Sequence, residues 1–238
     1  MTLLNVALYD KGLARLCFRV NPKNVMTPSG LTCLLAANMD IPQGCVVADL
    51  GCGCGILSII AAKLGAKLVY AVDVNPYALR DTTFNATTNG VSNVIRPVLC
   101  DIMNSVGILD GKVDVIVCNP PQAPVKNQDP KIGKWLSISR DGGVTGRVFL
   151  DSVISQAPRL FSGTRSTQKL EIVTTSLVGI RATFDRLEKT GFSPSIVVSS
   201  TLVPFTGGHR RPRGRDNNAQ IIDVDYERAV VIHATHHS

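Results

Sequence analysis

The chain has 238 residues, of which 45% are hydrophobic and 18% are charged. This composition excludes an intrinsically disordered chain and indicates one globular domain with a sizeable core. The net charge of +7 at pH 7 favours anionic partners only weakly, because net charge governs solubility and encounter rates rather than fold.

The segment before position 46 predicts few regular elements. Residues 1–25 favour a short strand or turn followed by a weak helix. Ser29 is expected to be the N-cap of a helix over residues 31–38, whose apolar side chains recur at helical spacing. The sequence does not start with a signal-peptide pattern and contains no apolar run of membrane-spanning length, so we expect a cytoplasmic protein.

From Val46 onward, strands and helices alternate. The apolar patterns predict strands over 46–50, 68–72, 94–99, 113–118, 170–175, 196–202 and 226–233, and helices over 56–64, 76–88, 148–161 and 180–189. Helices between consecutive strands predict βαβ units, and therefore an α/β fold with a mainly parallel sheet and helices on both faces. The last two strands lack a helix between them and should form an antiparallel pair at one edge.

A glycine-rich turn, GCGCG over residues 51–55, follows the first of these alternating strands. Glycines have no Cβ atom, so a ligand can approach the backbone closely, and the next helix offers its N-terminal N–H groups. The turn therefore predicts a nucleotide-type site at the carboxyl end of a central strand.

Polar residues mark the ends of four predicted strands: Asp49, Asp73, Asp101 and the turn 119–122 (NPPQ). Asp73 follows Gly55 by 18 residues (73 − 55), as one βαβ crossover requires, and its carboxylate can accept hydrogen bonds from a ribose diol. An NAD-dependent reductase is the alternative. Against it, GCGCG is not G-x-G-x-x-G, and no catalytic pair for a nicotinamide is evident.

The stretches DLGCGCG, AVDVNPYAL and CDI together resemble class I S-adenosylmethionine (SAM)-dependent methyltransferases. NPPQ is similar to the [DNS]-P-P-[YFW] motif of enzymes that methylate planar amino or amide nitrogens. Within this group MTPSGLT, VDVNPYAL and DGGVTGR resemble the HemK-type release-factor glutamine methyltransferases, with matches between about residues 26 and 202. The resemblance implies a Rossmann-like, seven-stranded methyltransferase sheet over residues 46–238. Residues 1–45 would be an N-terminal extension that packs over the cofactor site.

The resemblance also implies that SAM is the cofactor. Glycines of the turn would bind its methionine part, with Asp49 reaching the amino group directly or through water. Asp73 would bind the ribose hydroxyls, and Asp101 with Ile102 would hold the adenine. The complete set of expected cofactor-binding residues is Thr27, Pro28, Asp49, Gly51, Cys52, Gly53, Gly55, Asp73, Val74, Asp101, Ile102 and Asn119. We expect no metal.

Catalysis is expected from Asn119, Pro120, Pro121 and Gln122. The Asn119 side-chain oxygen and the Pro120 carbonyl would accept hydrogen bonds from an –NH₂ group and aim its nitrogen at the methyl group, by positioning and electrostatics. The prolines stiffen the turn. Gln122 stands where relatives have an aromatic residue, so it stacks poorly on a flat base. Gln122 and the loop 123–143 are expected to bind the methyl acceptor.

The sequence predicts an N-methyltransferase acting on an amide or amino nitrogen of a protein, peptide or small molecule. One alternative is methylation of an exocyclic amine in RNA or DNA, which the cations Arg210, Arg211, Arg213 and Arg215 favour. The other is a non-catalytic SAM-binding subunit that stabilises a protein partner.

Three further features are open to interpretation. Residues 125–140, with Trp135, form either a substrate lid or a solvated loop with the tryptophan packed inward. His233, His236 and His237 suggest a metal site, but a solvated tail is the simpler reading. The seven cysteines contain no C-x-x-C pair and are expected to be buried thiols in a reducing cytosol.

Overall fold

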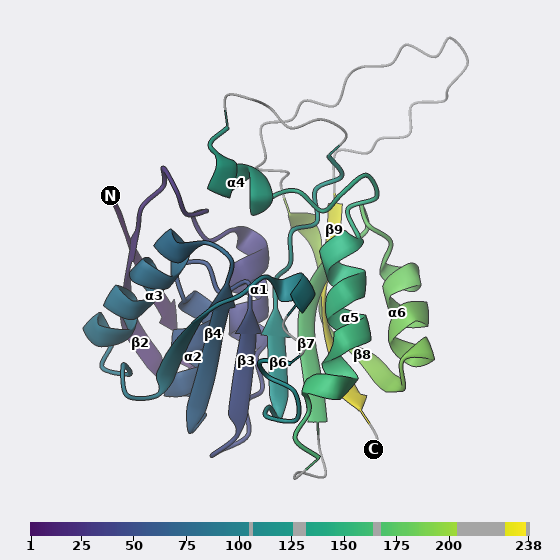
Figure 1. Cartoon of the computed structure of the whole chain (residues 1–238), viewed down its shortest axis with the longest axis horizontal. Coiled ribbons are helices and arrows are strands. Elements are labelled where there is room, and N and C mark those ends of the chain that lie inside the picture. The colour runs from purple at the N-terminus through teal and green to yellow at the C-terminus, as the bar shows by residue number, and fades with distance from the viewer. Residues whose placement is uncertain (105–106, 126–131, 164–167, 204–226, 237–238) are drawn as a thin grey trace.

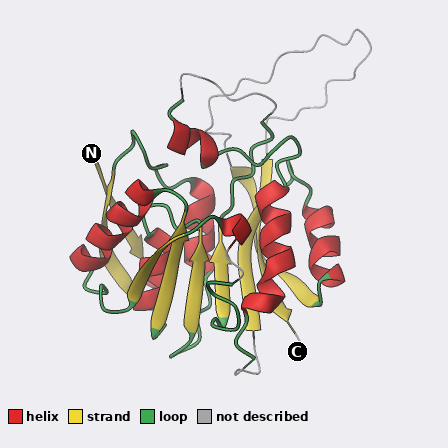
Figure 2. Ribbon diagram, in the orientation of Figure 1, coloured by secondary structure: helices red, strands yellow, loops and turns green. Residues whose placement is uncertain are grey.

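The protein is organised around a seven-stranded sheet with helices on both faces (Figures 1 and 2). This computed structural model describes residues 1–104, 107–125, 132–163, 168–203 and 227–236. The strands are β1 (Thr2–Leu8), β2 (Leu13–Val20), β3 (Val46–Leu50), β4 (Leu68–Asp73), β5 (Ile95–Leu99), β6 (Val115–Cys118), β7 (Gln168–Thr175), β8 (Phe192–Val203) and β9 (Glu227–His236). The helices are α1 (Gly30–Asn38), α2 (Ile56–Lys63), α3 (Pro76–Thr88), α4 (Lys134–Ile138), α5 (Val148–Leu160) and α6 (Ile180–Lys189), with 3₁₀ turns η1 (Tyr9–Lys11) and η2 (Ile102–Asn104).

The large sheet has the strand order β5-β4-β3-β6-β7-β9-β8. Strands β5, β4, β3, β6 and β7 are parallel, and β9 is antiparallel to both β7 and β8. The predicted sheet, mostly parallel with an antiparallel pair at one edge, is therefore confirmed. The last strand of the chain lies one position in from that edge, because β9 pairs with both of its neighbours.

Helices cover the two faces of the sheet through two separate apolar clusters. One cluster joins α1, α2 and α3 to the sheet, and Leu35, Ile59 and Ala86 belong to it. The other joins α5 and α6 through residues such as Leu150 and Leu187. Within β3 successive side chains alternate between the clusters, as the pleat of a strand covered on both faces requires.

The expected weak helix within residues 1–25 is wrong. β1 and β2 form an antiparallel hairpin in which Thr2 pairs with Val20. Leu16, Phe18 and Val20 are buried at every second position, and this period of two favours a strand over a helix. The hairpin is attached to α3, because Asn85 exchanges hydrogen bonds with the backbone of Arg19. The division between residues 45 and 46 stays a prediction.

The carboxyl ends of β3, β4 and β6 lie at the same end of the sheet, and α4 lies above this end (Figure 1). Helix α4 falls within the segment expected to be a loop. The predicted helices over 31–38, 56–64, 76–88, 148–161 and 180–189 all form, with ends that shift by one residue at most. In the described part of the chain, no helix is both long enough and apolar enough to cross a membrane.

Candidate active site

A cavity of about 390 Å³ opens at the carboxyl ends of the parallel strands. Its walls come from the segment before α1, the glycine turn after β3, the ends of β4 and β6, and α4. Most of the expected site residues line it: Thr27, Pro28, Gly51, Cys52, Gly53, Asp73, Val74, Asp101, Ile102, Asn119, Pro120, Pro121 and Gln122. Residues from distant segments of the sequence therefore meet at one cavity, whereas Asp49 and Gly55 lie behind its wall.

Gly55 serves the packing of the turn. It is the N-cap of α2 with φ of 84°, a left-handed conformation that L side chains rarely adopt. A Cβ atom at this position would lie 2.8 Å from the Thr82 side chain on α3. The glycine therefore allows α2 and α3 to approach each other behind the cavity.

Gly53 faces the open side of the turn. A Cβ atom built on Gly53 would meet no atom within 4 Å, so a ligand has room to approach its backbone. The Gly53 N–H donates a hydrogen bond to Asp73 Oδ2 at 2.9 Å, which ties the turn to the end of β4. This arrangement fits a cofactor that lies along the glycine turn.

Asp73 offers hydrogen-bond acceptors to the cavity. Its Oδ1 accepts from the Asn75 N–H at 2.9 Å, and its Oδ2 accepts from Gly53. Burial raises the pKa of Asp73 above its ordinary value, although these backbone N–H groups act in the opposite direction. Because each carboxylate oxygen has further lone pairs, the group suits a diol with two O–H donors.

Asp101 lies at the neighbouring strand end, beyond β5. Its Oδ1 accepts from the Met103 N–H at 3.0 Å, which holds the start of η2 in place. Ile102 is almost fully buried and presents an apolar wall to the cavity. A polar group beside an apolar wall suits a flat heterocycle such as adenine.

Asp49 is fully buried beneath the glycine turn. Ser58 Oγ on α2 donates to its Oδ2 at 2.5 Å, whereas Oδ1 has no hydrogen-bond partner among the residues that the structure describes. Burial raises the pKa of Asp49 to about 7. An unpaired buried carboxylate oxygen is costly unless a donor reaches it. Because Asp49 does not line the cavity, an amino group of a cofactor would reach this oxygen through water rather than directly.

The Asn-Pro-Pro-Gln turn follows β6. Asn119 Nδ2 donates to Thr32 Oγ1 at 2.9 Å, and none of the described residues donates to Asn119 Oδ1. Gln122 Nε2 donates to the carbonyls of Val173 at 3.0 Å and Pro120 at 3.4 Å. Gln122 is 8% exposed, and its Oε1 has no partner among the described residues. Gln122 therefore belongs to the cavity wall rather than projecting as a stacking ring would.

Helix α4 and the residues after it form a further wall of the cavity. Trp135, Ile138 and Arg140 line the cavity. The Ala123 N–H donates to the Arg140 carbonyl at 3.1 Å, so this segment is joined directly to the Asn-Pro-Pro-Gln turn. The inward position of Trp135 agrees with both readings of the segment, since a wall residue also faces a substrate.

Sequence reasoning missed several cavity residues. Thr32, Phe149 and Thr175 line the cavity but carry no motif of their own. Thr32 lies within the MTPSGLT stretch, so the resemblance located its segment without giving the side chain a role. Phe149 and Thr175 come from predicted elements whose positions in the sheet only the fold reveals. The arginines 210, 211, 213 and 215 fall outside the described residues.

The expected solvated histidine tail is wrong for two of its three residues. His233 and His236 belong to β9, and His236 packs against the rings of Phe161 and Phe192 with centroid distances of 5.7 and 5.1 Å. His237 lies outside the described residues. The expected burial of cysteines is right for Cys45, Cys52, Cys54 and Cys118, and wrong for Cys17 and Cys33, which are exposed.

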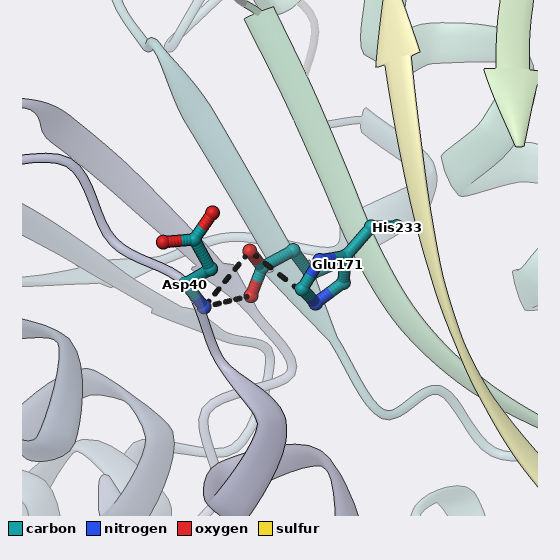
Figure 3. A group of neighbouring side chains, drawn as sticks. All are labelled: Asp40, Glu171 and His233. Atoms are coloured by element: carbon teal, nitrogen blue, oxygen red, sulfur yellow. Dashed lines mark hydrogen bonds and ion pairs between the residues drawn. The ribbon is translucent and has the colours of Figure 1, made fainter. Parts of the chain in front are cut away.

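Asp40, Glu171 and His233 form a cluster away from the cavity (Figure 3). One ligating atom from each lies within 4.8 Å of the others, as in a metal site. However, Lys169 Nζ lies 2.8 Å from both Asp40 Oδ2 and Glu171 Oε1. The Lys169 ammonium group therefore supplies the positive charge that a metal ion would otherwise supply. Burial lowers the pKa of His233 to about 4, so this imidazole is neutral at pH 7. We assign the cluster to structure.

These features define a class I SAM-dependent methyltransferase: a glycine turn after the central strand β3, acids at the next two strand ends, and an Asn-Pro-Pro turn after β6. Residues 28–142 match the model of the ribosomal protein L11 methyltransferase family (PrmA). The ribosomal protein L11 methyltransferase of Actinobacillus succinogenes is 38% identical over 43% of this chain and 34% of its own length.

A relative that aligns with most of the chain identifies the family more specifically. The protein named "Putative protein N5-glutamine methyltransferase" in Methanocaldococcus jannaschii is 35% identical over 182 residues, or 76% of this chain and 87% of that protein. The structure of Mtq2 from E. cuniculi, in complex with Trm112, has a TM-score of 0.57 at 20% identity, covering 89% of this chain and 98% of that one. The chain belongs to the HemK-type family of SAM-dependent methyltransferases.

Proposed function

We propose that this enzyme transfers the methyl group of SAM to the side-chain amide nitrogen of a glutamine in a protein. The observation that carries the proposal is the Asn119–Pro120 turn at the cavity, with Asn119 Nδ2 bonded to Thr32 and Oδ1 left to accept. The glutamine-directed relative in M. jannaschii, which covers most of this chain, supports the same acceptor.

The residues act mainly by orientation. SAM, when bound, supplies an electrophilic methyl group. Asp73, which lines the cavity, would hold the ribose of the cofactor, and Asp49 would act from behind the cavity wall through water. Asn119 Oδ1 and the Pro120 carbonyl accept hydrogen bonds from the two N–H groups of the amide, which aims the nitrogen and increases its electron density. A carbon–nitrogen bond forms as the carbon–sulfur bond breaks, and the nitrogen then loses a proton to water.

Gln122 supports an amide rather than a nucleobase as acceptor. It offers no ring to stack on a base, and its buried Oε1 is, among the described residues, an unpaired acceptor in the cavity wall. An N–H donor of an amide substrate would pair this acceptor if the side chain turns toward the cavity, which would relieve the cost of a buried acceptor without a partner. Trp135 lines the same cavity and is the feature that favours a base. RNA affinity that falls steeply with salt, with transfer to RNA, would support that alternative.

A protein acceptor is also consistent with the structural neighbour. In E. cuniculi, the Mtq2–Trm112 complex is responsible for methylation of the translation termination factor eRF1. We propose that the acceptor of the present enzyme is likewise a cytoplasmic protein, and that a protein partner joins it. Residues 1–45 would then serve as an extension over the cofactor site, since residues 27–32 line the cavity.

The test is methyl transfer from isotopically labelled SAM into a cell lysate, with the product located by tandem mass spectrometry. We expect label on the amide nitrogen of a glutamine. Asn119→Ala should abolish transfer and leave the dissociation constant for SAM nearly unchanged. Label on nucleic acid would contradict the proposed acceptor. Full activity of Asn119→Ala would contradict the proposed catalytic turn, and absence of any transfer would favour a non-catalytic subunit.

A further inference from the structure

Among the described residues, Thr32 is the only one whose side chain forms a hydrogen bond with the Asn119 side chain, at 2.9 Å between Asn119 Nδ2 and Thr32 Oγ1. The two residues are 87 positions apart in the sequence and meet because the start of α1 lies over the end of β6. Both line the cavity. This contact thus joins the first turn of α1 to the turn that we propose to be catalytic.

The hydrogen bond discriminates between the two ends of the Asn119 amide. A primary amide has an N–H end and an oxygen end of nearly equal size. With Nδ2 donating to Thr32, Oδ1 is the end left for an acceptor N–H. The Thr32 hydroxyl can direct its own proton to Ser29 Oγ, 3.4 Å away, and keep lone pairs for Asn119. A rotated amide would present an N–H group to the substrate N–H and repel it.

Helix α1 holds Thr32 at a fixed position. Thr32 is the third residue of α1 and completes a capping box with Ser29, so its side chain is part of the helix start. Just beyond the other end of α1, the Asp40 N–H donates to both carboxylate oxygens of Glu171 on β7, at 3.1 and 3.3 Å. These bonds appear as dashed lines in Figure 3. The helix is therefore attached to the sheet at both ends.

We propose that Thr32 is the positioning residue that sets the Asn119 amide for catalysis, with its hydroxyl as the required group. The proposal rests on the proposed function, because it gives Asn119 Oδ1 the task of accepting the substrate N–H. Thr32 acts through Asn119 and need not touch the reacting atoms. It should therefore affect turnover more than cofactor binding.

The experiment compares Thr32→Val and Thr32→Ala, which remove the hydroxyl, with Thr32→Ser, which keeps it. Thr87→Val is the matched control, since Thr87 is an exposed helical threonine on α3, outside the cavity. We expect kcat to fall about five- to tenfold in Thr32→Val and Thr32→Ala, the factor expected for one neutral hydrogen bond. The dissociation constant for SAM should stay within about twofold. Thr32→Ser should restore kcat, and Thr87→Val should not change it.

A spectroscopic readout separates positioning from a general effect on folding. The Asn119 side-chain NH₂ signals, identified by their loss in Asn119→Ala, should shift in Thr32→Val and return toward the wild-type positions in Thr32→Ser. Circular dichroism checks that each variant is folded. Thr32→Ala preserves helix propensity, so it remains informative if valine disturbs the first turn of α1.

The outcomes distinguish this inference from the proposed function. If Asn119→Ala retains full activity, the proposed function fails first. If Asn119→Ala abolishes transfer but Thr32→Ala turns over like the wild type, only the role of Thr32 is overturned. If Thr32→Ser is as slow as Thr32→Val, the methyl group of threonine matters rather than its hydroxyl, and the inference is also wrong.

Discussion

Replacement of Asp49 by asparagine should change how the stability of the protein depends on pH. Asp49 is fully buried, and only one of its two carboxylate oxygens has a partner among the described residues, the Ser58 hydroxyl. Burial raises the pKa of the carboxyl from 3.8 to about 7. The folded state therefore holds this proton more tightly than the unfolded state does.

The sign and size of the effect follow from proton linkage. Between about pH 4 and pH 7 the folded state binds more protons than the unfolded state, so Asp49 makes the protein less stable as the pH rises. About three pKa units at 1.36 kcal/mol each correspond to about 4 kcal/mol across this window. Asp49→Asn cannot ionise, so it should lack this loss. Above pH 7 the difference between the proteins should level off.

The assay is urea unfolding of the cofactor-free protein at several pH values between about 4.5 and 8, for the wild type and Asp49→Asn. The useful quantity is the difference in unfolding free energy between the two proteins. Glu171, whose pKa burial also raises to about 7, is present in both and cancels in that difference. As the pH rises, we expect Asp49→Asn to gain up to about 4 kcal/mol of unfolding free energy relative to the wild type. A difference that does not vary with pH would refute the reasoning.

Four further predictions concern the surroundings of the cavity. Gly55→Ala should destabilise the protein by about 1–3 kcal/mol in thermal unfolding, because φ is 84° and the new Cβ would meet Thr82 at 2.8 Å. Gly53→Ala meets no atom within 4 Å but also has a left-handed φ of 56°, so it should lose less stability than Gly55→Ala while weakening SAM binding measured by calorimetry. Equal stability losses in the two variants would contradict this. Lys169→Met removes the ammonium partner of buried Glu171, so it should lower the unfolding free energy by about 3 kcal/mol in urea at pH 8. The loss should be smaller at pH 6, because the Glu171 carboxyl, with a pKa raised to about 7, is then protonated. Gln122→Met should raise KM for the methyl acceptor about tenfold and leave the SAM dissociation constant unchanged. A weaker affinity for SAM would argue against the proposal that Gln122 contacts the acceptor.

The sequence predicted the alternating strands and helices from Val46 onward because periodicity is strong there. The GCGCG turn and the acids at strand ends predicted the location of the cavity, since parallel strands bring their carboxyl ends to one edge. The hairpin β1–β2 does not follow from the sequence because apolar Leu13 and Cys17 obscure the alternation of Leu16, Phe18 and Val20, which only burial makes visible. Short helix α4 was missed because five residues give too little periodic signal.

Contacts between distant segments could not be predicted from one sequence. The bond between Asn119 and Thr32, and the position of Lys169 among Asp40, Glu171 and His233, depend on how α1 packs across the sheet. The orientation of the Asp49 carboxylate depends on the depth at which the glycine turn lies. Sequence motifs thus predicted which residues line the cavity, whereas packing determined the orientation of each group.

Methyl transfer to glutamine is the central claim, and the position of the transferred methyl group tests it most directly. The enzyme would be incubated with labelled SAM and protein fractions of a lysate, and modified peptides would be sequenced by tandem mass spectrometry. The account predicts methyl on the amide nitrogen of a glutamine, dependent on Asn119. Methyl on another side chain or on a nucleobase, or labelling that persists in Asn119→Ala, would contradict it.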